Sequence, residues 1–263
     1  MKKILSIVNI IVFGAMLYLN YMGGAGLIND INTGEVSNLY PTLFTPAGFT
    51  FSIWGIIYLL NLSFIIHQTY KAFRLPENYD LRLNQGFFFI SITNSVWIVA
   101  WHRLAVGYSL FLMLMLLLFL LGTYWQSRKP KYTSEYITEF VNFSVYLSWI
   151  SVATIANTAI FLTTAGFSAT GDMATILTVI VILVAVGLAL FFTLKQLNPW
   201  YALVILWASY GIYAARDAVI MESNGGLVPA GTEAVKMTAI TAVFIVFAGL
   251  VYFRILQGRK AQN

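Results

Sequence analysis

Three apolar segments of the sequence carry tryptophan and tyrosine at helical spacing, with an amide side chain on or beside the same face. In the first segment, Trp54 and Tyr58 are four residues apart, and either Asn61 or Leu62 continues their stripe. The second stripe contains Asn94, Trp97 and Trp101, and the third contains Asn142, Tyr146, Trp149, Ala153 and Asn157. Aromatic faces beside a few amides and hydroxyls suit noncovalent binding of a flat, apolar molecule. The alternative is that these side chains only pack helices together or anchor them at the membrane interface.

Other kinds of chemistry find little support in the sequence, so we predict no catalytic residue and no metal site. The chain has no cysteine, no lysine in the middle of an apolar segment and no acidic residue at the centre of one. These absences argue against thiolate chemistry, a retinal Schiff base and a proton-relay pump. His67 and His102 fall at opposite ends of their segments, about 30 Å apart across a bilayer, and are interpreted as interfacial side chains.

The elements that position these stripes are predicted to be membrane-spanning helices. The chain is 59% hydrophobic and 10% charged, with a mean hydropathy of +0.79, which is too apolar for a water-soluble domain. Only helices or closed barrels satisfy the backbone in lipid, and stretches of about 20 apolar residues favour helices. We therefore predict an all-α polytopic membrane bundle with about eight transmembrane helices. They are expected at 4–21, 49–70, 83–101, 106–125, 137–162, 173–194, 200–220 and 235–256.

The distribution of basic residues predicts that both termini lie inside, in a multi-pass protein of the cell membrane. With the loops assigned alternately to the two sides, twelve of the 15 lysines and arginines fall inside, and only Arg103, Arg216 and Lys236 fall outside. The net charge of +5 then reflects topology and anionic lipid headgroups, and no nucleic-acid partner is expected. The first segment could also be a secretory signal, but its apolar run is longer than usual for one.

In this orientation the three stripes lie in the outer halves of their helices, below a long outer segment. That segment, about residues 22–48, is long enough to act as a lid. Near the outer end of the seventh helix the charged residues are interpreted as a local charge network, with a clamp for a ligand carboxylate as the alternative. They are Arg216, Asp217, Glu222, Glu233 and Lys236.

Three spaced motifs in this order resemble the TspO/MBR family, the tryptophan-rich sensory proteins related to the mitochondrial translocator protein. The first resembles the family's Pro-x4-Pro-x7-Trp-Gly-x2-Tyr pattern and the second its Asn-x2-Trp element. The third resembles its Tyr-Leu-x-Trp-x3-Ala-Thr-x2-Asn element. The matching residues are Pro41, Pro46, Trp54, Gly55 and Tyr58, then Asn94 and Trp97, then Tyr146, Leu147, Trp149, Ala153, Thr154 and Asn157.

The resemblance implies a five-helix bundle over residues 1–165, to which residues 166–263 add three further transmembrane helices. It also implies a pocket below the first loop for porphyrins and other tetrapyrroles, sterols or synthetic aromatic ligands. The implied ligand-binding residues are Pro41, Pro46, Trp54, Tyr58, Asn94, Trp97, Trp101, Tyr146, Trp149 and Asn157. No cofactor is required, porphyrin or haem is the candidate ligand, and the expected partners are the bilayer, a hydrophobic small molecule and a second copy in a homodimer.

Three departures from the family pattern bear on the predicted activity. Leu43 stands where the family usually has a tryptophan, Gly48 where a second aromatic often follows, and Val145 where a proline precedes the Tyr-Leu pair. The loss of the loop tryptophan weighs against porphyrin degradation. We therefore predict a receptor-like protein with a sensory or regulatory role. A small-molecule transporter is the alternative, and a tetrapyrrole-degrading enzyme is less favoured.

Overall fold

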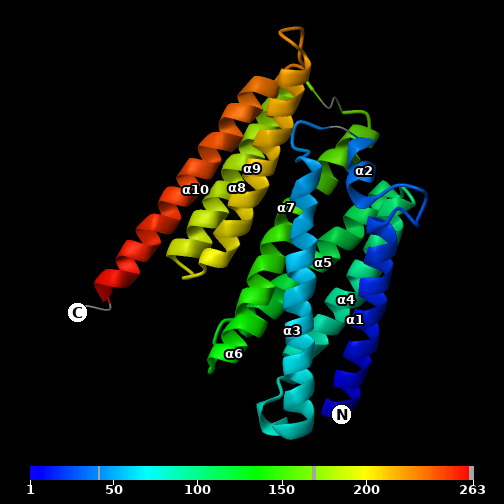
Figure 1. Cartoon of the computed structure of the whole chain (residues 1–263), viewed down its shortest axis with the longest axis vertical. Coiled ribbons are helices and arrows are strands. Elements are labelled where there is room, and N and C mark those ends of the chain that lie inside the picture. Colours follow the sequence, from blue (N-terminus) through cyan, green and yellow to red (C-terminus); the bar gives the residue numbers. More distant parts are fainter. Residues whose placement is uncertain (41, 168–169, 261–263) are drawn as a thin grey trace. The chain divides into compact units, whose positions relative to one another are not determined.

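A computed structural model describes residues 1–40, 42–167 and 170–260 of the chain, and over these residues it contains helices and no strand (Figure 1). Eight helical segments are long and apolar enough to cross a membrane, as the sequence predicts. The helices before the fifth crossing are α1 (Lys2–Gly24), α2 (Thr33–Asn38), α3 (Ile53–Arg74), α4 (Leu81–His102) and α5 (Val106–Ser127). The remaining α-helices are α6 (Thr133–Glu135), α7 (Asn142–Thr164), α8 (Asp172–Leu194), α9 (Pro199–Glu222) and α10 (Thr232–Lys260).

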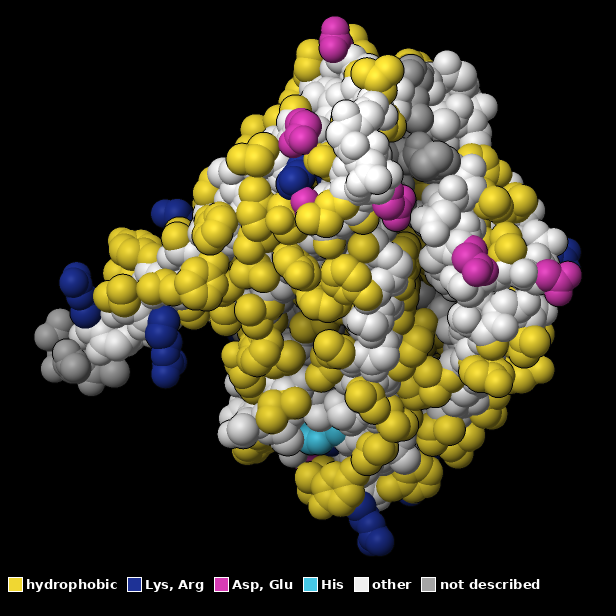
Figure 2. Space-filling model, turned by 45° about the horizontal axis from the view of Figure 1, so that its top comes forward, with side chains coloured by type: hydrophobic (Ala, Val, Ile, Leu, Met, Phe, Trp, Pro, Cys, Tyr) yellow, Lys and Arg dark blue, Asp and Glu magenta, His cyan; other side chains and the backbone are white. Residues whose placement is uncertain are grey.

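Short non-α segments complete two of the crossings. The 3₁₀-helix η1 (Gly48–Ser52) leads directly into α3, and the π-helix η3 (Tyr136–Val141) joins α6 to α7. A second 3₁₀-helix, η2 (Pro76–Asn78), connects α3 to α4. Large apolar side chains such as Leu59 and Leu118 remain exposed along the helices, and Figure 2 shows hydrophobic side chains over much of the helical surface. This distribution suits helices whose sides face lipid.

The helix boundaries follow from local capping chemistry. The Asp80 side chain accepts a hydrogen bond from the backbone nitrogen of Leu83 at 3.0 Å, which caps the N-terminus of α4. Asn198 caps α9 in the same way through Tyr201, and Pro199 occupies the first turn, where no backbone donor is needed.

The chain divides by its contacts into two compact units. Unit 1 comprises Met1–Val36 and Phe51–Asn157, and unit 2 comprises Ser37–Thr50 and Thr158–Asn263. The predicted division into residues 1–165 and 166–263 stays a prediction. Unit 1 contains α1, α3, α4, α5 and the π-helix, with α4 packed against both α1 and α5. Unit 2 contains α8, α9 and α10, which pack against one another pairwise (Figure 1).

A layer of four buried phenylalanines fills the interior of unit 1, and we call it the phenylalanine layer. Phe64 of α3 contacts Phe87 of α4 with ring centroids 4.8 Å apart and Phe143 of α7 with centroids 5.1 Å apart. Phe13 of α1 contacts Phe87 at 6.0 Å. Each of the four is at most 3% exposed, so the layer joins four helices through a dry, apolar contact.

In unit 2 the segment 42–50 docks on α9. The indole nitrogen of Trp207 donates to the carbonyl of Thr50 at 3.0 Å, and the backbone nitrogen of Ala47 donates to the carbonyl of Gly211, also at 3.0 Å. A Cβ at residue 211 would come within 2.1 Å of the Thr50 hydroxyl oxygen, so this close approach requires glycine. The segment predicted as a lid is therefore held in part by α9.

The predicted charge network at the end of α9 is only partly present. Lys236 pairs with Asp217 at 2.7 Å. Arg216, however, donates to the backbone carbonyls of Thr42 at 3.2 Å and Thr45 at 3.3 Å. The prediction was wrong for this arginine, because its guanidinium bonds to the docked segment and to no carboxylate among the residues that the structure describes.

Candidate ligand site

The predicted aromatic residues come together in unit 1 as one continuous group of rings, which we call the aromatic cluster. Trp54 stacks on Tyr58 with centroids 5.6 Å apart and on Trp97 at 5.9 Å, and Trp97 in turn stacks on Trp101 at 6.0 Å. Trp54 also makes edge-to-face contacts with Tyr146 at 5.9 Å and Trp149 at 6.2 Å, with nearly perpendicular planes. The cluster thus comprises Trp54, Tyr58, Trp97, Trp101, Tyr146 and Trp149.

Helical periodicity explains why three separate helices contribute to this cluster. Trp54 and Tyr58 lie one turn apart on α3, Trp97 and Trp101 one turn apart on α4, and Tyr146 and Trp149 nearly one turn apart on α7. All of them except the half-buried Tyr58 are at most 9% exposed. The α3 stripe continues through Asn61, because Asn61 is fully buried whereas Leu62 is 42% exposed.

Several polar atoms in the cluster or beside it have no hydrogen-bond partner within the described chain. The indole nitrogens of Trp97 and Trp149, the amide nitrogen of Asn94 and the hydroxyl of Tyr146 are all buried and unpartnered. A buried donor without a partner costs about 1–3 kcal/mol, and native proteins contain few of them. The four groups lie on two helices, α4 and α7.

Asn94 is oriented by a contact with α1, and its amide group lies near the Tyr146 hydroxyl. Its amide oxygen accepts a hydrogen bond from the Asn20 side chain of α1 at 2.7 Å, and Asn20 also donates to the carbonyl of Met16 at 2.8 Å. The Tyr146 hydroxyl interacts electrostatically with Asn94 without making a hydrogen bond of standard geometry. Asn20 was not among the predicted site residues, although its position in α1 as a buried amide could have drawn attention to it.

Trp101 differs from Trp97 and Trp149, whose indole nitrogens have no partner within the described chain. Its nitrogen donates to the backbone carbonyl of Thr33, at the start of α2, at 3.2 Å. Trp101 therefore ties α2 to α4, and its polar atom is already used inside the protein.

Two of the predicted site residues, Asn157 and Pro46, are not part of the cluster, and the prediction for a third cannot be compared with the structure. Asn157 accepts a hydrogen bond from Ser109 of α5 at 2.9 Å and donates to the carbonyl of Ala153 at 3.2 Å, so its amide serves helix packing. Pro46 is buried in the segment that belongs to unit 2, and Pro41 lies outside the described residues.

The positions that depart from the family pattern fall into different environments. Leu43 is 2% exposed. It lies so close to Gly231 in unit 2 that a Cβ at residue 231 would touch it. Gly48 is exposed at the start of η1, and Val145 is 7% exposed within α7. Leu43 thus has a packing role within unit 2.

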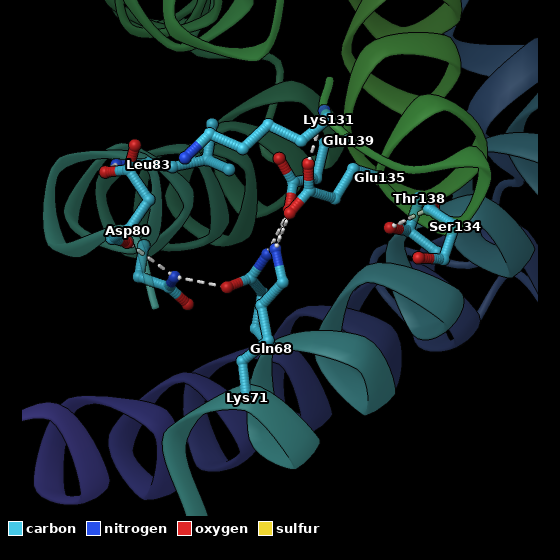
Figure 3. A network of polar contacts seen from close by, with 10 residues as sticks. Gln68, Lys71, Asp80, Leu83, Lys131, Ser134, Glu135, Thr138 and Glu139 are labelled. Carbon is cyan, nitrogen blue, oxygen red and sulfur yellow. Dashed lines mark hydrogen bonds and ion pairs between the residues drawn. The ribbon is translucent and has the colours of Figure 1, made fainter. Parts of the chain in front are cut away.

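A second group of polar side chains in unit 1, absent from the sequence predictions, lies on the other side of the phenylalanine layer along α3 and α4. Lys71 donates to Glu135 at 2.7 Å and to Glu139 at 2.8 Å, and all three side chains are at most 10% exposed. Gln68 donates to Glu139 at 2.7 Å and accepts from Asn84 at 2.9 Å. Figure 3 shows these side chains converging from α3, α4 and the α6–η3 segment, and we call them, with His67, the inner polar network.

Sequence spacing offered a weak signal for this network. Gln68 and Lys71 are three residues apart on α3, and Glu135 and Glu139 are four apart, so each pair can share a helical face. Lys71 is one of the twelve basic residues that the sequence assigns to the inner side, but it is only 4% exposed. The π-helix that carries Glu139 could not be recognised from composition.

The two histidines occupy different environments. His102 is fully buried, with Nδ1 2.9 Å from the carbonyl oxygen of Ile98 and Nε2 3.1 Å from that of Gly23. The interfacial interpretation was therefore wrong for His102, because α1 covers the ring at Gly23, where a Cβ would come within 2.6 Å of it. His67 is half-buried beside Glu135 and Glu139.

A comparison with protein-family models adds independent evidence on relationship. The model of the family described as TSPO-like protein matches residues 6–252, which includes all or part of each of the eight membrane-spanning segments. No curated protein and no solved structure matches the chain. Together with eight apolar helices, the family match identifies a multi-pass integral membrane protein. The chain belongs to the TSPO-like protein family.

Proposed function

We propose that this TSPO-like protein binds a flat, apolar ligand carrying hydrogen-bond acceptor atoms at the aromatic cluster of unit 1, in a sensory or regulatory role. The observation that carries this proposal is the set of buried, unpartnered donors on Asn94, Trp97, Tyr146 and Trp149. A ligand oxygen or ring nitrogen would satisfy these donors and remove the free-energy cost of leaving them unpaired.

The arrangement of rings supports a flat ligand. Trp54 stacks on both Tyr58 and Trp97, and stacked rings can part to admit another planar ring between them. The ligand would then stack on the faces that the parted rings had covered. A tetrapyrrole or a synthetic aromatic compound with carbonyl groups fits this chemistry best, and a sterol would use the apolar walls with its single hydroxyl.

The phenylalanine layer favours binding over transport. It joins α1, α3, α4 and α7 by direct ring contacts and lies between Asn61 and Gln68 along α3. A polar or flat molecule moving through unit 1 from the aromatic cluster would have to displace these rings. A site closed on one side by such a layer suits a receptor.

The proposal is tested by titrating the purified chain in detergent with protoporphyrin IX, haem and a sterol while following tryptophan fluorescence. Trp149→Phe and Asn94→Leu each remove an unpartnered donor, and each should weaken binding of an acceptor-bearing ligand by about tenfold, or about 1.4 kcal/mol. Trp54→Ala removes the central ring and should weaken binding further.

Two matched variants control for the loss of an indole. Trp101→Phe removes an indole whose nitrogen is already bonded to Thr33, and Trp125→Phe removes an indole that is 55% exposed at the end of α5. Trp125→Phe should retain the wild-type affinity, and Trp101→Phe, which keeps an aromatic ring beside Trp97, should lose less affinity than Trp149→Phe. Equal affinities in the wild type, Trp54→Ala, Trp149→Phe and Asn94→Leu would exclude the aromatic cluster as the site. Accumulation of the ligand in proteoliposomes would point to a transporter, and light-dependent loss of porphyrin absorbance would point to an enzyme.

A further inference from the structure

The inner polar network contains a group of side chains with the composition of a metal site. His67, Glu135 and Glu139 each offer a ligand atom, and these three atoms lie within 4.8 Å of one another. Glu135 and Glu139 are each 7% exposed, and His67 is half-buried. Imidazole nitrogen and carboxylate oxygen are ligands that zinc and related divalent transition metals use in proteins.

Two of the coordinating groups have atoms that the network leaves unused. The Nε2 atom of His67 is shielded from solvent and has no hydrogen-bond partner in the described chain. Glu139 accepts the bonds from Gln68 and Lys71 on the same oxygen, Oε1, so its Oε2 can bind another group. Glu135 is oriented by a hydrogen bond from the backbone nitrogen of Lys131 to its Oε2 at 2.7 Å (Figure 3).

The charge of the group also favours a cation. Two carboxylates face a single ammonium, so with a neutral imidazole the site carries one net negative charge in a largely buried position. Buried charge is costly unless it is compensated. A divalent ion would supply the second positive charge, and the ammonium of Lys71 occupies the position between the carboxylates where such an ion would lie.

We propose that His67, Glu135 and Glu139 form a binding site for a divalent transition-metal ion of the zinc class, and that the ion takes the place of the Lys71 ammonium. Coordination at about 2.0–2.2 Å would place ligand atoms about 3.4 Å apart, which rotations of the two glutamates can reach from the present spacing. The ammonium can withdraw on its flexible four-carbon stem, because Lys71 lies in the last turn of α3. The π-helix η3 supplies Glu139, and such segments recur at functional sites. This site is separate from the aromatic cluster.

The test is a titration of the full chain, purified without a histidine tag, with Zn²⁺ by calorimetry and with Co²⁺ by visible absorption, which reports nitrogen and oxygen coordination. The wild type should bind one ion per chain. His67→Ala leaves the pairs of Lys71 with both glutamates intact, and it should weaken binding at least about tenfold. Lys71→Met removes the competing ammonium and should tighten binding about tenfold. Zn²⁺ should therefore stabilise this variant more than it stabilises the wild type.

Glu77→Gln controls for adventitious binding, because Glu77 is exposed in η2 and outside the group. Its affinity should equal that of the wild type. Absence of saturable binding by the wild type up to about 1 mM would overturn the proposal, even if Lys71→Met binds the ion. Wild-type affinity in His67→Ala would overturn it as well, since the ion would then lie elsewhere.

Discussion

The two polar regions of unit 1 differ in how they use their hydrogen-bonding groups. In the inner polar network, Lys71 donates to two carboxylates, and Gln68 both donates and accepts. In the aromatic cluster, the donors of Trp97, Tyr146 and Trp149 have no partner within the described residues. Both regions are buried, so both bear the cost of removing polar atoms from water. Internal bonds offset that cost for Lys71 and Gln68 in the inner network, but not for these three donors of the aromatic cluster.

This difference separates a region whose internal bonds hold helices together from one whose unpartnered donors are, in our proposal, available to a ligand. Paired charges between α3 and the α6–η3 segment fix those elements to each other, and breaking such a pair is expensive. The unpartnered donors of the aromatic cluster contribute nothing to folding and carry a penalty. Substitutions that break the pairs of the inner polar network should therefore lower stability, whereas conservative substitutions that remove only an unpartnered donor of the aromatic cluster should lower ligand affinity and leave stability almost unchanged.

The largest expected effect is a loss of stability in Lys71→Met. Removing the ammonium leaves Glu135 and Glu139 as uncompensated buried carboxylates, and the free energy of unfolding should fall by about 4 kcal/mol in the absence of metal. The measurement is reversible denaturation of the purified chain in mixed detergent micelles. Ligand affinity at the aromatic cluster should not change.

Lys131→Met is the matched control for that variant. Lys131 is exposed, and the contact with Glu135 comes from its backbone nitrogen, which the substitution retains. Its stability should remain within about 0.5 kcal/mol of the wild type. Equal stabilities of Lys71→Met and Lys131→Met would show that the buried ion pairs do not stabilise unit 1.

Phe87→Ala is expected to have the next largest effect. Phe87 is fully buried in the phenylalanine layer and contacts both Phe13 and Phe64. Its removal creates a cavity between the two polar regions and should cost about 3 kcal/mol of stability. Phe89→Ala, on the same helix but 47% exposed, should cost less than about 1 kcal/mol by the same denaturation measurement. A similar loss in the two variants would mean that the layer is not a tightly packed core.

Much of the aromatic cluster could be predicted from the sequence because it depends on one local rule. Residues three or four apart share a helical face, so Trp54 with Tyr58, and Tyr146 with Trp149, were placed together without knowledge of the tertiary structure. The number of membrane-spanning helices followed from apolar length alone. The joint role of the aromatic residues in ligand binding stays a prediction.

The inner polar network and the docking of segment 42–50 could not be predicted, because they depend on long-range contacts and on local geometry that composition does not encode. Lys71 is a surface residue by type, and only the approach of Glu135 and Glu139 from a distant segment makes its burial favourable. The docking of segment 42–50 requires Trp207 and Gly211, more than 150 residues away in sequence. Pairings of this kind are set by how helices pack, and periodicity within one helix does not reveal them.

Tyr146→Phe should affect affinity alone. The substitution removes an unpartnered hydroxyl and keeps the ring that meets Trp54. Affinity for an acceptor-bearing ligand should fall about fivefold to tenfold, or about 1–1.4 kcal/mol, while stability stays within about 1 kcal/mol of the wild type. Fluorescence titration and denaturation of the same preparation give both quantities. A large loss of stability with unchanged affinity would assign Tyr146 to packing.

The smallest expected effect is the coupling between the two regions. Lys71 on α3 and Tyr146 on α7 lie on either side of the phenylalanine layer, in which Phe64 and Phe143 join the two helices, so their effects on stability should add. In a double-mutant cycle of Lys71→Met, Tyr146→Phe and the combined variant, the interaction energy should be below about 0.5 kcal/mol. A coupling above about 1 kcal/mol would show that the layer transmits changes between the inner polar network and the aromatic cluster. Repeating the cycle with Phe87→Ala as the background would then test whether the layer carries that coupling, because loss of the ring should abolish it.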